Sequence, residues 1–364
     1  MMNADAILKL AFKLGASDVH VTVNSAPAFR LHGKLLPFDA PEWQDRLGAE
    51  VAATGRLTPE DTDKLVRQIM TKAQYQKFQE IGELDFSYAI PGIGRFRVNT
   101  FKQQGNVGFV IRLINSNILS FQELGLPEVL ADLSRKPRGL VLVTGPTGSG
   151  KSTTLASMLD LINRESHHHI ITLEDPIEFV HQHNKCIINQ REVGRDTQSF
   201  ASALRAAMRE DPDVILVGEM RDPETIGTAI TAAETGHLVV GTLHTSSAAQ
   251  TIDRIIDVFP PHQQQQIRVQ LASTLQGIIA QTLVPRVDKP GRVAAIEIMV
   301  ATPAIRNLIR EGKTYQITSQ IQTGARFGMQ TLDMALRSLY LKKMISRKDV
   351  LSCANDVETL SKML

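Results

Sequence analysis

The sequence predicts two domains, a small α+β domain followed by a larger α/β domain built on a parallel sheet. In the first 115 residues, short runs with period-2 character alternate with turns, which is typical of antiparallel strands. From residue 138 onward, near-continuous apolar runs are separated by helical patterns, as in a parallel sheet covered on both faces. A glycine-rich turn, GPTGSGKS, follows the first of these apolar runs directly.

The predicted first domain, residues 1–115, contains five strand-like runs and two helical patterns. Pro91-Gly92 lies between the third and fourth runs and indicates a hairpin turn. The segment 39–57 lacks a clear period, and we interpret it as an insertion or loop. The strand-like runs are 18–23, 28–36, 84–90, 94–101 and 108–114, and the helical patterns lie near 4–14 and 59–80.

The predicted second domain, residues 138–364, is separated from the first by a linker at 116–137. This segment is polar at its start and is closed by Pro137. The apolar strands of the second domain are expected at 140–144, 169–173, 213–217 and 237–243, with three further helices near 261–281, 302–312 and 329–343.

The composition describes a globular protein with no sign of a role in coating nucleic acid. Hydrophobic residues make up 43% and charged residues 21% of the 364-residue chain, as in ordinary globular proteins. The 40 basic and 38 acidic side chains leave a net charge of +2, which argues against nucleic acid as the main partner. No apolar run approaches the roughly 18 residues that span a bilayer, and the N-terminus lacks the features of a signal peptide. The isolated cysteines, Cys186 and Cys353, fit buried thiols in a reducing cytoplasm.

The glycine-rich turn matches the pattern G-x-x-x-x-G-K-[ST] in its required setting between a strand and a helix. Glycines allow backbone N–H groups to face the β-phosphate of a nucleotide, and the helix N-terminus adds its positive dipole. Lys151 is expected to neutralise the β- and γ-phosphates, and the Ser152 hydroxyl to ligate Mg²⁺. The nucleotide-binding residues predicted in this way are Gly145, Pro146, Thr147, Gly148, Ser149, Gly150, Lys151, Ser152 and Thr153.

Hydrolysis also needs a group that orients or deprotonates water. The strand run 213–217 is followed by Gly218 and Glu219, where nucleotide-hydrolysing proteins usually carry an Asp-Glu pair. Glu219 is therefore the candidate general base. The alternative is a glutamate that is merely exposed at a strand end.

A second group of carboxylates follows the neighbouring strand. Glu174, Asp175 and Glu178 in LEDPIEF are expected at the same carboxyl edge of the sheet, where open α/β folds bind ligands. They could hold hydrated Mg²⁺ through its bound waters, and a solvated acidic turn is the alternative. His244, after the strand at 237–243, could sense the γ-phosphate, or it could be structural.

Four segments together resemble the secretion ATPases of the type IV pilus and type II secretion class. They are the phosphate loop at 145–152, the acidic segment ITLEDPIEF at 171–179, VILVGEMRD at 214–222, and the histidine segment at 235–260. The glycine at position 218 matches that family, which lacks the usual aspartate. The segments ASDVHV at 16–21 and GRFRVN at 94–99 also resemble its first domain, so the resemblance covers nearly the whole chain.

Within this class the chain resembles the pilus retraction branch, the PilT-like proteins. The stretch AIRNLIRE within 304–313 is a signature of that branch. Assembly and secretion members commonly carry a long N-terminal extension and a tetracysteine zinc module, whereas this sequence begins almost directly at ASDVHV and has two cysteines.

The resemblance implies a PAS-like first domain joined to a RecA-like ATPase domain, with six identical subunits in a ring. It also implies that nucleotide lies between the two domains and that arginines of the first domain approach the γ-phosphate. The matching positions are Arg95, Arg97 and Arg112; from the residues alone, without the resemblance, we favour a charged strand face at these positions. Weaker candidates for subunit contacts are Arg191, Arg205 and Arg209.

We therefore expect a cytoplasmic ATPase at the inner face of the cytoplasmic membrane, with ATP and Mg²⁺ as cofactors, that drives retraction of type IV pili. The resemblance implies an inner-membrane platform protein as partner, a paralogous retraction ATPase as a further partner, and membrane association only through partners. Alternatives are a pilus assembly or type II secretion ATPase and, more remotely, a RecA-like nucleic-acid motor.

Overall fold

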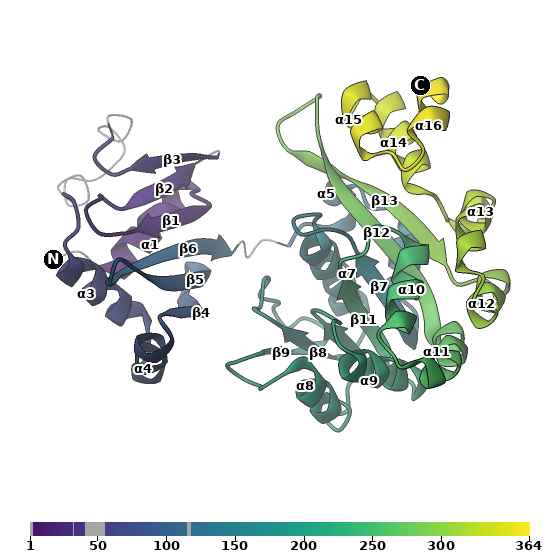
Figure 1. The fold of residues 1–364 in the computed structure, drawn as a ribbon, viewed down its shortest axis with the longest axis horizontal. Coiled ribbons are helices and arrows are strands. Elements are labelled where there is room, and N and C mark those ends of the chain that lie inside the picture. The colour runs from purple at the N-terminus through teal and green to yellow at the C-terminus, as the bar shows by residue number, and fades with distance from the viewer. Residues whose placement is uncertain (1–2, 32, 41–54, 115–117) are drawn as a thin grey trace. The chain divides into compact units, whose positions relative to one another are not determined.

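The chain folds into two compact units, each with its own sheet (Figure 1). In this computed structural model the described residues are 3–31, 33–40, 55–114 and 118–364. Residues 1–117 with Glu178–Val180 form the first unit, and residues 118–177 with 181–364 form the second. The predicted fold class, mixed α/β with a separate sheet in each half, is confirmed.

The described strands of the first unit form a six-stranded antiparallel sheet in the order β3-β2-β1-β6-β5-β4. The predicted hairpin at Pro91-Gly92 is confirmed, since Ile90 pairs with Gly94 across the turn between β4 and β5. The strands are β1 (Asp18–Val21), β2 (Ala28–Leu31), β3 (Lys34–Pro37), β4 (Glu83–Ile90), β5 (Gly94–Gln103) and β6 (Asn106–Ile114).

Among the described residues of the first unit, three helices share an apolar core with one face of this sheet. Strand β5 alternates buried Phe96 and Val98 with polar residues, so its other face carries charged side chains. The helices are α1 (Ala4–Leu14), α3 (Pro59–Ile69) and α4 (Lys72–Ile81). The largest fully buried side chains of this core are Phe29, Phe78, Phe96, Phe109, Leu8, Leu65 and Ile111.

The described strands of the second unit form a seven-stranded sheet in the order β13-β12-β7-β11-β10-β8-β9. Every neighbouring pair is parallel except β12 and β13. Strands β7, β10 and β11 are buried along their whole length, as expected for a sheet covered on both faces. The strands are β7 (Gly139–Thr144), β8 (His169–Glu174), β9 (Ile187–Glu192), β10 (Val214–Val217), β11 (Leu238–Leu243), β12 (Leu275–Pro285) and β13 (Arg292–Val300).

Helices cover both faces of the second sheet (Figure 1). One face packs against α6 and α7, and the other against α8 to α13. Helices α14 to α16 form a smaller cluster with the distal part of β12 and β13. None of the helices in the described ranges is long and apolar enough to cross a membrane. The helices are α5 (Phe121–Leu124), α6 (Glu128–Ser134), α7 (Lys151–Glu165), α8 (Phe200–Ala207), α9 (Pro223–Glu234), α10 (Ala248–Asp257), α11 (Pro261–Thr274), α12 (Pro303–Arg310), α13 (Ile317–Gln322), α14 (Leu332–Leu341), α15 (Arg347–Cys353) and α16 (Val357–Met363).

The helix predicted at 261–281 is wrong over 275–281. Helix α11 ends at Thr274, and the chain continues directly into strand β12, which pairs with β7 and β13. The ladder to β7, which is distant in the sequence, and to the neighbouring β13 overrides a local pattern that is compatible with a helix. Gly277, followed by two isoleucines, was the available signal for a strand.

Two other predicted elements are divided in the structure. The strand run at 28–36 becomes β2 and β3, because Gly33 adopts a positive φ of 84° between them. The helical pattern at 59–80 becomes α3 and α4, because Thr71 starts a new helix with a capping box to Gln74.

Two segments of the sequence prediction need separate mention. Most of the predicted insertion at 39–57 lies outside the described residues. The segment 116–137, expected to be a linker, contains α5 and α6 and is grouped with the second unit from Ile118 onward.

Candidate active site

The glycine-rich loop connects the end of β7 to the first residue of α7. Gly145, Gly148 and Gly150 have φ values of 143°, 78° and 89°, which side-chain-bearing residues rarely adopt. A β-carbon on Gly145 would lie 2.2 Å from the carbonyl oxygen of Gln281 in β12. The loop conformation therefore requires glycine and is packed directly against β12.

Lys151 folds back over this loop from the first position of α7. Its Nζ donates hydrogen bonds to the carbonyl oxygens of Gly145, at 2.7 Å, and of Pro146, at 3.1 Å. Ser152 and Thr153 follow in the first turn of the helix and are half-buried. The structure thus places the Lys151 ammonium group against the loop at the N-terminus of α7, where both the charge and the helix dipole favour an anion.

Gln281 belongs to this site and was missed by the sequence prediction. It is 3% exposed, and its Nε2 donates to the carbonyl oxygen of Ser149 at 2.7 Å. Its Oε1 accepts a hydrogen bond from the Thr154 hydroxyl at 3.0 Å. The residue was missed because 275–281 was interpreted as helix, which placed it far from the loop.

The close approach of β10 to β8 explains the glycine at position 218. The Gly218 N–H donates to the Leu173 carbonyl at 2.7 Å, and its carbonyl accepts from the Thr242 hydroxyl at 2.5 Å. A β-carbon on Gly218 would lie 2.9 Å from the Leu173 carbonyl oxygen and 3.2 Å from the Glu174 Cα. An aspartate side chain therefore has no room here without movement of the strands.

Glu219 and His244 meet at the carboxyl edge of the sheet, as expected from their strands. The His244 Nε2 lies 2.8 Å from the Glu219 Oε1, and the Glu219 side chain is 19% exposed. Arg221 makes a hydrogen bond to the same Oε1, which raises the pKa of the Arg221 guanidinium. The carboxylate that the sequence identified is thus held between two nitrogen groups, of which Arg221 was not predicted.

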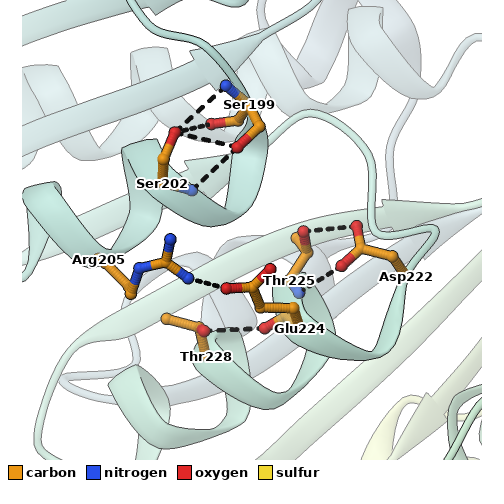
Figure 2. Close-up of polar contacts among 7 residues, drawn as sticks. All are labelled: Ser199, Ser202, Arg205, Asp222, Glu224, Thr225 and Thr228. Atoms are coloured by element: carbon orange, nitrogen blue, oxygen red, sulfur yellow. Dashed lines mark hydrogen bonds and ion pairs between the residues drawn. The ribbon is translucent and has the colours of Figure 1, made fainter.

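Asp222, the other acidic residue of this segment, caps a helix. It is the N-cap of α9, and its carboxylate accepts from the Thr225 N–H at 2.8 Å and the Thr225 hydroxyl at 2.7 Å. Figure 2 shows this cap beside an ion pair between Arg205 of α8 and Glu224 of α9. Arg205, a candidate for a subunit contact, therefore ties two helices of the same chain together.

Of the predicted acidic cluster, Glu174 is the member built into the sheet. Its Oε1 accepts from the Thr172 hydroxyl at 2.6 Å and from the Gln190 Nε2 at 3.1 Å. Asp175 and Glu178 are exposed. Within the part of the chain that the structure describes, no group of three or more His, Cys, Asp or Glu side chains is arranged to hold a metal ion.

The predicted arginines of the first unit all lie on the polar face of its sheet. In the strand register, Arg97 of β5 lies opposite Arg112 of β6, and Arg112 lies opposite Asp18 of β1. The Arg112 Nε lies 2.8 Å from the Asp18 carboxylate, and the Arg97 Nε lies 3.7 Å from Asp85. These four side chains line a pocket of about 310 Å³.

Arg95 lies two residues before Arg97 on the same strand. Its Nη2 donates to the Ser87 hydroxyl at 2.9 Å. Arg191, a weaker candidate in the second unit, forms an ion pair with Glu210 at 2.8 Å.

The helix that carries AIRNLIRE, α12, uses its first arginine to hold the end of α11. Arg306 Nη1 donates to the carbonyls of Ala272, at 2.5 Å, and Ser273, at 2.9 Å, and Nε donates to Ala301 at 3.0 Å. Burial lowers the pKa of this guanidinium. Arg310, one turn later, is exposed.

Comparison with known proteins places the chain among secretion and pilus ATPases. The family described as type II/IV secretion system protein matches residues 2–346. The chain is 53% identical over 348 residues to the type IV pilus retraction ATPase PilT of Pseudomonas aeruginosa, covering 96% of this chain and 97% of that protein. It is 49% identical over 335 residues to a twitching motility protein of Neisseria gonorrhoeae, covering 92% and 86% of the two chains.

The fold also matches a solved relative over its full length. A crystal structure of the pilus retraction motor PilT with bound ADP has a TM-score of 0.90 and 49% identity to this chain, covering 100% of both. Both the sequence and the fold thus agree with the resemblance carried by the four segments. The chain therefore belongs to the type II/IV secretion system protein family, in its PilT-like branch.

Proposed function

We propose that this chain is an ATPase that converts ATP hydrolysis into retraction of type IV pili. The observation that carries the proposal is the full-length match, in sequence and fold, to a pilus retraction motor that binds ADP. The intact glycine-rich loop and the Glu219–His244 pair supply the groups that hydrolysis requires.

The nucleotide is expected at the loop between β7 and α7. Lys151 leaves its loop carbonyls to neutralise the β- and γ-phosphates, and backbone N–H groups of the loop bind the remaining oxygens. The half-buried Ser152 hydroxyl in the first turn of α7 fits a Mg²⁺ ligand, since a bound Mg²⁺ takes its other ligands from phosphate oxygens and water. When bound, Mg²⁺ neutralises charge that develops on the phosphates.

Glu219 is proposed to orient the attacking water and accept its proton. His244 and Arg221 fix the direction of the carboxylate. Glu174 lies at the same carboxyl edge and is held by Thr172 and Gln190, which suits a group that orders the water shell of the metal ion. Asp175 and Glu178, both exposed, are proposed to contribute to that water shell.

Arg95, Arg97 and Arg112 are proposed to reach the γ-phosphate when the two units close around ATP. Their position on one polar sheet face supports the proposal, because a guanidinium can exchange a surface carboxylate for phosphate oxygens. Loss of the γ-phosphate removes this contact, so hydrolysis favours reopening.

The proposed working form is a homohexameric ring at the inner face of the cytoplasmic membrane. It acts on an inner-membrane platform protein, with a paralogous retraction ATPase as a further partner, and touches the membrane only through partners. Pilus assembly or type II secretion is the competing function on the same fold. A nucleic-acid motor is not favoured, since the sequence has a net charge of +2 and only 5% aromatic residues.

The test is a count of surface pili and surface motility in cells whose sole copy carries Glu219→Gln. The change keeps the shape of the side chain and removes its negative charge. Abundant pili on non-motile cells are expected, whereas bald cells would identify an assembly motor. Glu358→Gln is the matched control, because Glu358 is exposed in α16 and pairs only with Lys362 among the described contacts.

A further inference from the structure

Gln281 joins two parts of the phosphate site through one buried side-chain amide. Ser149 precedes the last glycine of the loop, and Thr154 lies in the first turn of α7. The amide donates to the Ser149 carbonyl at 2.7 Å and accepts from the Thr154 hydroxyl at 3.0 Å. Because a carbonyl can only accept, the amide nitrogen must face Ser149, so the orientation of the amide is fixed.

The bond to the Ser149 carbonyl also sets the direction of a backbone N–H. In a planar trans peptide, the carbonyl of Ser149 and the N–H of Gly150 point in opposite directions. Since the carbonyl points at β12, the Gly150 N–H points away from β12, and it is one of the loop N–H groups that are expected to face a phosphate. The Ser149 hydroxyl is buried and has no hydrogen-bond partner among the described residues, so it does not share this task.

We propose that Gln281 is a positioning residue for nucleotide phosphates, acting through the peptide between Ser149 and Gly150. It does not touch the nucleotide. It keeps the glycine-rich loop in its binding conformation before nucleotide binds. Binding therefore does not incur the entropic cost of ordering that peptide. The proposal rests on nucleotide binding at this loop and extends it to a residue of β12.

The first test compares two glutamines on the same strand. Gln281→Met keeps the length of the side chain and removes both hydrogen bonds. Gln276→Met is the matched control, because Gln276 Nε2 donates to the backbone carbonyl of Arg138 at 3.0 Å and, among the described contacts, makes no hydrogen bond to the phosphate loop. ADP affinity in the presence of Mg²⁺, measured by calorimetry on the full chain, is expected to fall about 10-fold in Gln281→Met and to stay unchanged in Gln276→Met.

A second variant separates positioning from a general packing defect. In Gln281→Glu, an ionised carboxylate faces the Ser149 carbonyl and repels it, whereas the protonated acid can donate to Ser149 and still accept from Thr154. Burial disfavours the ionised carboxylate, and a fall in pH increases the fraction of the protonated acid. The ratio of variant to wild-type ADP affinity is therefore expected to rise toward one at acidic pH, a change that a packing defect does not produce.

Thr154→Val gives a further readout that does not depend on substitution of Gln281. It removes one of the two hydrogen bonds that hold the amide and should weaken ADP binding less than Gln281→Met does. In the double variant the two losses are expected to be less than additive, because both act through one amide.

The proposal is overturned if Gln281→Met, folded by circular dichroism, binds ADP as tightly as wild type, or if Gln281→Glu shows the pH dependence of wild type. If Gln281→Met does not fold, wild-type ADP affinity in Thr154→Val overturns it. Wild-type protein that fails to bind ADP would instead contradict the proposed ATPase function, so the two failures are distinguishable.

Discussion

Replacing Gly218 with alanine should destabilise the second unit, because β8 leaves no room for a β-carbon. The added atom would lie 2.9 Å from the Leu173 carbonyl oxygen and 3.2 Å from the Glu174 Cα. Both are backbone atoms of a buried strand, held by the bond from the Gly218 N–H to the Leu173 carbonyl at 2.7 Å. They cannot turn aside as a flexible side chain could. Forcing an extra atom into such packing costs about 1–3 kcal/mol of stability.

The assay is thermal unfolding of the full chain followed by circular dichroism, with Gly227→Ala as the control. Gly227 lies in α9, where a β-carbon would be 3.7 Å from the Phe259 ring, an ordinary contact. Alanine in a helix is favoured over glycine by about 1 kcal/mol. Gly218→Ala is therefore expected to lower the unfolding temperature and Gly227→Ala to raise it. A Gly218→Ala protein that unfolds at the wild-type temperature would refute the steric explanation for the missing aspartate.

Three further predictions concern Lys151, Arg306 and Glu297. Lys151→Met should abolish binding of a fluorescent ATP analogue, because it removes the ammonium group that is expected to neutralise the phosphates. Wild-type affinity in this variant would contradict the proposed binding of nucleotide phosphates by Lys151. Arg306→Ala should lower the free energy of unfolding in denaturant by about 2–3 kcal/mol, since it leaves backbone carbonyls at the end of α11 without their donor. Arg310→Ala should change it by about 0.5 kcal/mol or less. Equal effects of the two substitutions would contradict the role of Arg306 in holding the end of α11. Burial raises the pKa of Glu297, so its contribution to stability is present below the ordinary glutamate range and is lost as the pH rises through the raised value. A pH series of unfolding midpoints should show this decline in wild type and not in Glu297→Gln, and the same slope in both would contradict it.

The sequence alone was sufficient for the parts of the site that depend on local pattern. The glycine-rich loop carries its own conformational requirement, since its glycines adopt φ values that other residues avoid. Glu219 and His244 could be assigned to one sheet edge because each follows a buried parallel strand, and they are 2.8 Å apart in the structure.

The parts that could not be predicted depend on contacts between distant segments. Gln281 lies on a strand whose pairing with β7 cannot be read from local residues, and the helical interpretation of 275–281 concealed it. Likewise, the sequence showed that an aspartate is missing at position 218 but not why, because the reason is the proximity of β8. The role of Arg306 at the end of α11 is a third case, since helices α11 and α12 are separated by two strands in the sequence.

The central claim is that ATP hydrolysis at this site drives pilus retraction. It is tested most directly by imaging labelled pili on living cells. Extension and retraction events are counted in cells that carry wild type, Glu219→Gln or the Glu358→Gln control as their sole copy. We predict that extension continues in Glu219→Gln cells while retraction events disappear, and that Glu358→Gln cells behave as wild type. Loss of extension with Glu219→Gln would contradict the account, because it would mean that this motor builds the pilus.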